Sequence, residues 1–207
     1  MKYSKLILTV ISLLYSINAL PHDFEVEGIY YKIISSSEKT LKVSYKGNNS
    51  YSYSNEYKGD VSIPDKVHYN GIDYTVIEIQ SSAFEGCSEL SSIIIPSNVT
   101  SIGNNAFRGC VKLSTIVIED GESVLSIGHD TSSSNGKNLK FLSDCPIKQL
   151  YIGRELSYNS SEEYGLSPFC NCTELTSAPE LPATDLSAGC YAYMFSGCTS
   201  LVAAPEL

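Results

Sequence analysis

The residue types that most often carry catalysis are few in this sequence, and they do not cluster. The three histidines, His22, His68 and His129, lie in unrelated contexts: near the N-terminus, in an expected turn and in an expected loop. The chain contains no G-x-S-x-G, no H-E-x-x-H and no phosphate-binding G-x-x-x-x-G-K-[ST] motif. The sequence therefore predicts no catalytic residue, no bound cofactor and no enzyme activity.

Metal ligands are also poorly represented. Glu119, Asp120 and Glu122 form an acidic run, which we interpret as a solvated turn, with a weak calcium site as the alternative. The C-x-C at 170–172 has no histidine near it, so it is a weak indication of a transition-metal site. We expect no metal centre.

Five of the seven cysteines recur at one position of a repeat, and these are Cys87, Cys110, Cys145, Cys172 and Cys198. A small residue held at one repeat position favours a buried core thiol over a bridge or a ligand. Cys170 and Cys190 lie outside that pattern and are the better candidates for an oxidised pair.

Tyr51, Tyr53 and Tyr57 alternate within a segment rich in serine and asparagine. Aromatic rows can stack on sugar rings, so this segment raises the possibility of carbohydrate binding. Alternating tyrosines equally suit an ordinary strand that pairs its side chains across a sheet, which is the interpretation we favour.

Residues 1–19 have the organisation of a secretory signal peptide. Lys2 and Lys5 precede ten apolar residues, and small residues follow up to Ala19. The apolar run is too short to span a membrane, and no other stretch is long and apolar enough. Removal of this segment leaves 12 basic and 23 acidic residues, a net charge of about −11. That charge argues against nucleic acid and against anionic membrane as partners.

The elements that carry these residues repeat. SAFEGCSELSSIIIPSNVTSIG (82–103) is followed by NAFRGCVKLSTIVI (105–118), with matching residues 23 apart. A fixed period in the low twenties with the pattern L-x-x-L-x-L predicts a leucine-rich repeat solenoid. We therefore expect a mainly β, right-handed solenoid of short parallel strands with little helix. Such a solenoid commonly serves as an extended binding surface.

Three regions are expected along the chain: a signal peptide at 1–19, an N-terminal β cap at 20–60, and the solenoid at 61–207. In the cap, residues 24–33 and 40–45 are β-rich and should form a hairpin. In the solenoid, 129–140 and 154–168 are expected loops, and the end at Leu207 within a repeat predicts further coils.

One repeat position needs a separate interpretation. Gln80 occupies the place that glycine takes at Gly103 and Gly128. We interpret the two glycines as left-handed corners, a conformation that glutamine at the first corner would not require.

The sequence resembles the BspA-like leucine-rich repeat proteins of host-associated bacteria. The matching pieces are AFEGCSELSSIIIPSNVTSIGNNAFRGCVKL (83–113), FLSDCPIKQLYIGREL (141–156) and CYAYMFSGCTSLVAAPEL (190–207). This resemblance implies a secreted or cell-surface protein, and some members bind host matrix proteins or other cells. It fixes no binding residue. The leading functional hypothesis is a non-enzymatic protein that adheres to an extracellular or host matrix protein; a carbohydrate-binding module of a surface glycan system is the alternative.

The strand pattern also predicts which residues face outward. Leu90, Ile93 and Ile95 should point inward, because side chains alternate across a strand. The outward positions in three successive coils are then Ser92, Ile94, Thr115, Val117, Gln149 and Tyr151. Strand preference alone explains the apolar members of this set. As a functional hypothesis, they form a ridge that binds the partner.

Overall fold

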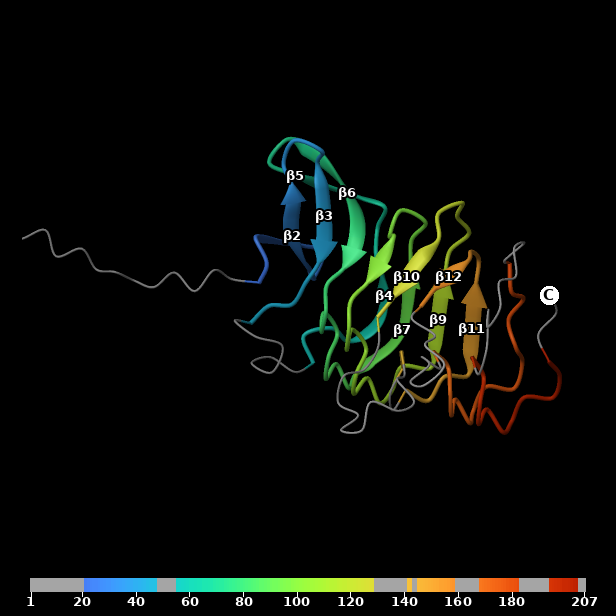
Figure 1. Ribbon diagram of the computed structural model, residues 1–207. Helices are drawn as coiled ribbons and strands as arrows, with labels where there is room; N and C mark the ends of the chain where they lie inside the picture. Colours follow the sequence, from blue (N-terminus) through green and yellow to red (C-terminus); the bar gives the residue numbers. More distant parts are fainter. Residues whose placement is uncertain are drawn as a thin grey trace, which may run out of the picture.

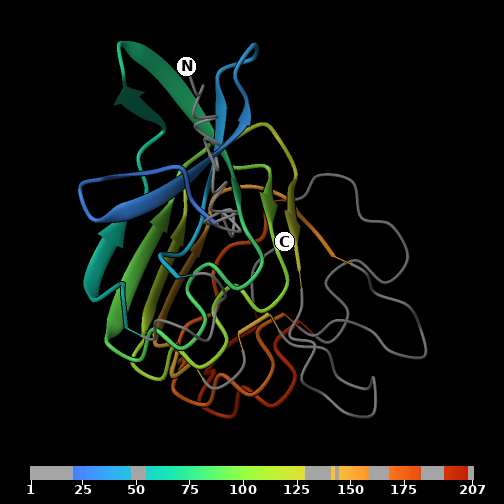
Figure 2. The same ribbon diagram turned by 90° about the vertical axis from the view of Figure 1, so that its left-hand side faces the viewer.

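The computed structural model describes residues 21–47, 55–128, 141–142, 145–158, 168–182 and 194–204. These residues form twelve strands and, within the described ranges, no helix. Figure 1 shows successive coils side by side, and Figure 2, seen along the stack, shows two sheets as opposing walls. The predicted mainly β leucine-rich repeat solenoid is confirmed.

Sheet B is the smaller wall and has four parallel strands in the order β11-β9-β7-β4. Its strands are β4 (Gly59–Ser62), β7 (Leu90–Ile95), β9 (Thr115–Ile118) and β11 (Gln149–Ile152). In register, Ile93 pairs with Val61 of the coil before and with Ile116 of the coil after. This is the alignment that the repeat predicts.

Sheet A has eight strands in the order β1-β2-β3-β6-β8-β10-β12, with β5 paired to β6. Its strands are β1 (Phe24–Val26), β2 (Ile29–Ser35), β3 (Thr40–Val43), β5 (Lys66–Tyr69), β6 (Ile72–Ile79), β8 (Ser101–Ile102), β10 (Leu125–Ile127) and β12 (Leu156–Ser157). The strands from β3 to β12 pair in parallel, whereas the hairpins β1–β2, β2–β3 and β5–β6 are antiparallel.

Inward side chains of both sheets meet in one hydrophobic core, which includes Leu90, Ile93 and Ile95 as predicted. One line of rings runs through this core from coil to coil. Its members, in order, are Tyr30, Tyr57, Phe84, Phe107, Phe141, Phe169 and Phe195, with successive ring centroids 4.5–6.2 Å apart. Aromatic pairs at such spacings add about 0.5–1.5 kcal/mol each beyond their buried area. We call this line the aromatic stack.

The N-terminal strands extend sheet A, because β3 pairs in parallel with β6. The predicted hairpin is present as β2–β3. Two further hairpins were not predicted, and they turn at Glu27-Gly28 and Asn70-Gly71, where all four residues have positive φ. Positive φ at both central residues defines a type I′ turn, and Asn-Gly is its strongest sequence signal. His68 accordingly lies in β5 and not in a turn.

Two further expectations were wrong. Gly103 and Gly128 do not have positive φ. A Cβ on Gly128 would lie 2.6 Å from the amide nitrogen of Asn104, so close approach of the preceding coil requires glycine there. Residues 154–168 are not loop throughout, because β12 pairs with β10 and Leu156 faces the core beside Leu125.

The end of the second coil departs from the repeat. The repeat aligns Val124 with the buried Val99, yet Val124 is 43% exposed and Leu125 is buried. The longer turn of this coil moves the inward position by one residue.

Several predicted features lie outside the described residues. These are the signal peptide at 1–19, Tyr51, Tyr53, His129, the loop at 129–140, the later part of the loop at 154–168 and Cys190. Among the residues that are described, no helix has the length and apolar character needed to cross a membrane.

Candidate functional site

The outward positions of sheet B form two straight rows. Strand register places Asp60, Ser92, Thr115 and Gln149 in one row. It places Ser62, Ile94, Val117 and Tyr151 in the other. All six residues predicted for the partner-binding ridge therefore lie on this surface, which we call the outer face of sheet B.

Among the apolar residues of the second row, exposure is greatest at β11. Ile94 and Val117 are half-buried, since each is flanked by neighbours on both sides in the row. Tyr151, in the last strand of the sheet, is 49% exposed. The outer face thus offers apolar contact area that ends on an aromatic ring, the residue class enriched in protein interfaces.

The first row is polar and begins with a carboxylate. Asp60 Oδ1 accepts hydrogen bonds from the hydroxyls of Ser91 and Ser92, at 2.8 and 2.7 Å. These two hydroxyls lower the pKa of Asp60 because they stabilise its charged form. The face therefore carries a fixed negative charge at its β4 end.

Tyr151 closes the face at its β11 end. Its hydroxyl donates to Asp120 Oδ1 over 2.6 Å. The ring also borders a hollow of about 410 Å³ between β11 and the segment Glu180–Pro182. Pro179 and Pro182 in this stretch have no backbone N–H to donate, and no strand of the described residues pairs with the outer edge of β11.

Arg154 supports the same region from within, a role that the sequence did not reveal. It is buried, and its guanidinium donates to the carbonyl oxygens of Ser97 and of Pro96, the latter at 2.8 Å. Its side chain passes Gly121, where a Cβ would lie 3.2 Å from Arg154 Cδ. Arg154 therefore holds the long turn of the second coil against the first.

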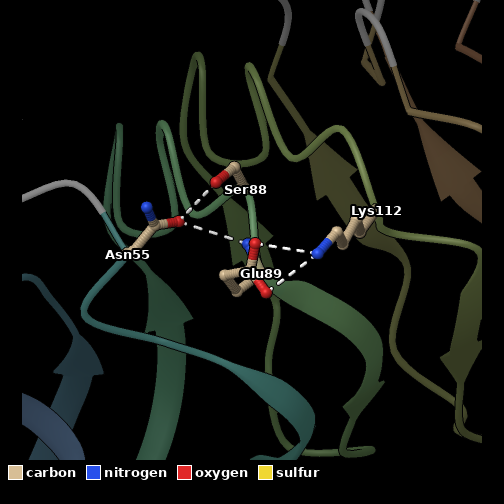
Figure 3. A network of polar contacts seen from close by, with 4 residues as sticks. All are labelled: Asn55, Ser88, Glu89 and Lys112. Atoms are coloured by element: carbon tan, nitrogen blue, oxygen red, sulfur yellow. Dashed lines mark hydrogen bonds and ion pairs between the residues drawn. The ribbon is translucent and has the colours of Figure 1, made fainter.

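Two basic side chains beside the sheet, Lys112 and Lys148, are paired with carboxylates. Glu89 forms an ion pair with Lys112 at 2.8 Å. Its backbone amide donates to Asn55 Oδ1, which also accepts from the Ser88 hydroxyl (Figure 3). Lys112 in turn lowers the pKa of Glu89. Lys148, just before β11, pairs with Glu174 at 3.1 Å.

The described part of the chain does not support a metal site or sugar binding by Tyr57. No group of three or more histidine, cysteine, aspartate or glutamate side chains there could hold a metal ion. Asp120, from the acidic run, faces Tyr151. Tyr57 is 2% exposed and its hydroxyl donates to the carbonyl oxygen of Ser44, so its ring is not available to stack on a sugar.

The five repeat cysteines are buried as predicted, and Cys170 is buried with them. The thiols of Cys110, Cys145 and Cys198 each donate to a carbonyl oxygen of the preceding coil, at 3.0–3.4 Å. Burial raises the pKa of Cys87 to about 11 and that of Cys110 further still. The repeat thiols are thus core residues with suppressed reactivity.

Solved structures similar to this chain are leucine-rich repeat proteins. One from Bacteroides ovatus is 24% identical with a TM-score of 0.50, over 87% of this chain and 46% of that chain. A leucine-rich cell surface protein from Faecalibacterium prausnitzii is 22% identical with a TM-score of 0.48, over 87% and 41%. The chain thus spans less than half the length of these two proteins, and at 24% identity the likeness to the first shows the fold alone.

A leucine-rich repeat protein from T. pallidum is 20% identical with a TM-score of 0.45, over 87% of this chain and 80% of that one. No curated protein matches the chain. A family model described as BspA type Leucine rich repeat region matches residues 49–155 in six copies. This match covers just over half of the sequence, and the chain belongs to the BspA-type leucine-rich repeat family.

Proposed function

We propose that this chain is an exported, non-enzymatic binding protein that adheres to an extracellular or cell-surface protein through the outer face of sheet B. The observation that carries the proposal is the row of Ile94, Val117 and Tyr151, which strand register aligns on three successive strands. An aligned apolar row on an outer surface is typical of an interface.

The shape of the face supports a macromolecular partner. Its side chains stand on parallel strands about 4.8 Å apart, so their spacing is set by the backbone ladder. A rigid surface loses little conformational entropy on binding, which favours affinity. Hydroxyl and amide groups of Ser92, Thr115 and Gln149 lie beside the apolar row and can satisfy polar groups of the partner.

Export is supported by the signal-peptide pattern of residues 1–19 and by family membership. The lack of catalytic motifs supports a non-enzymatic role. A carbohydrate ligand receives less support, since Tyr57 of the tyrosine segment is buried in the core.

The test is a binding panel of immobilised extracellular-matrix proteins and whole cells, run beside a glycan array. Val117→Arg should weaken binding to the matched protein more than tenfold, because a long charged side chain interrupts the apolar row. Ile34→Arg is the matched control, since Ile34 is an exposed apolar strand residue of sheet A. Both variants should keep the wild-type thermal midpoint within a few degrees.

Equal binding by wild type and Val117→Arg would reject the outer face of sheet B as the site. A chain that binds glycans on the array and no protein would favour the carbohydrate alternative. Folding of Val117→Arg is checked by its circular dichroism, so that loss of binding is not confused with loss of structure.

A further inference from the structure

The hollow beside Tyr151 has a chemical character that the rest of the outer face lacks. It is bounded on one side by Tyr151 and Gly153 of the third coil and on the other by Glu180 and Pro182 of the fourth, with Asp120 beside the tyrosine. Its volume of about 410 Å³ exceeds that of a single side chain. Backbone, an aromatic ring and two carboxylates therefore meet in one open space.

Both carboxylates border the hollow beside Tyr151, and one of them contacts the tyrosine hydroxyl. Asp120 accepts its hydrogen bond at 2.6 Å. The pKa of Tyr151 is raised, first by this hydrogen bond and further by the charges of Asp120 and Glu180. Two acidic residues thus line one open space beside an aromatic ring, where a cation would be attracted by both charges and by the ring face.

Among the described residues, no lysine or arginine forms an ion pair with Asp120 or Glu180. Lys112 and Lys148, beside the sheet, are paired with Glu89 and Glu174. None of the eight outward positions of sheet B is basic, and Asp60 adds a negative charge at the far end.

We propose that the protein bound on the outer face of sheet B is basic, and that it inserts an arginine or lysine side chain into the hollow between Tyr151, Asp120 and Glu180. This inference rests on the proposed function and specifies the chemistry of the partner. The cation would complete the charge balance at Tyr151 while the segment that bears it lies along the row of Val117 and Ile94.

The experiment uses the full chain and two small probes, N-acetyl-arginine amide and its uncharged isostere N-acetyl-citrulline amide, followed by NMR. The arginine probe should shift the backbone amide signals of Gly153 and Leu181 saturably and bind about fivefold more tightly than the citrulline probe. Asp120→Asn combined with Glu180→Gln should abolish this preference, and added salt should weaken it. Glu38→Gln is the control, since Glu38 is an exposed carboxylate in the turn after β2.

Equal affinity for the two probes would overturn the inference, as would a preference that survives the double substitution or an absence of saturable shifts at Gly153. Shifts of the same signals by a neutral methyl glycoside, with none by the arginine probe, would also overturn it in favour of a sugar site. Because the probes do not require the partner, this result is independent of the Val117→Arg test, so either proposal can fail alone.

Discussion

The thiol of Cys110 donates a hydrogen bond to the carbonyl oxygen of Phe84, 3.1 Å away in the preceding coil. The same contact joins Cys145 to Phe107 and Cys198 to Phe169. The recurrent cysteine is therefore a small buried donor that satisfies a carbonyl at the corner of the preceding coil, a role compatible with any redox environment.

Replacing Cys110 by alanine tests this role. Loss of the thiol removes a weak hydrogen bond and leaves a small cavity, so we expect the free energy of unfolding to fall by about 1–2 kcal/mol. Urea titration followed by circular dichroism measures this change. An unchanged midpoint would show that the contact adds nothing to stability.

Alkylation gives a second test of the thiols. Burial raises the pKa of Cys87 to about 11, so at pH 8 only about one thiol in a thousand would be ionised even if it were reachable. We expect Cys87 and Cys110 to remain unlabelled by iodoacetamide in the native protein and to react fully in denaturant, as read by peptide mass spectrometry. A disulfide joining Cys87 to Cys110 would contradict the buried-thiol assignment.

The glycine corners allow a test of close packing. In Gly128→Ala the new Cβ would meet backbone atoms of the adjacent coil at 2.6 Å, and we expect a loss of about 3 kcal/mol. Gly71→Ala places its Cβ in open space and should cost about 1–2 kcal/mol, from its positive φ alone. Thermal unfolding of the two variants compares them, and a larger loss in Gly71→Ala would reject the packing argument.

Glu56 predicts a pH dependence. Burial raises its pKa from 4.5 to about 7, although it accepts a hydrogen bond from the Lys46 amide. Because the folded state holds this proton more tightly than the unfolded state, the contribution of Glu56 to stability is complete below pH 4.5 and is lost as the pH rises to 7. The thermal midpoint of wild type should therefore fall across this window more than that of Glu56→Gln. Parallel curves would show that Glu56 does not titrate in this way.

Much of the fold was predictable because one repeat specifies both the inward positions and the register. Ile93 and Ile116 recur 23 residues apart and pair in the sheet, and the outward neighbours Ile94 and Val117 follow from alternation. The candidate face was found for the same reason. Whether it binds a partner is not encoded in that period, since strand preference would produce the same row.

The remaining features depend on contacts between residues far apart in sequence. Arg154 donates to the carbonyl oxygen of Pro96 across the second coil. No local sequence pattern predicts a hydrogen bond between residues 58 apart. The hollow beside Tyr151 likewise needs Glu180 of the next coil. The Asn70-Gly71 turn, by contrast, has a local signal, because Asn-Gly favours a two-residue hairpin. The solenoid alignment through Val67 obscures this signal.

The aromatic stack has a consequence for how such a chain can change in length. Phe84 meets Phe107 at 5.3 Å with the rings stacked, whereas Phe107 meets Phe141 edge to face at 5.7 Å, so each coil contributes one ring to the line although the ring angles differ. A stretch of chain bounded by two of these rings can therefore be duplicated or deleted by recombination with the junction re-formed between equivalent rings. Between Tyr57 and Phe169, each such event would lengthen or shorten the outer face by one strand while its two ends keep their own chemistry.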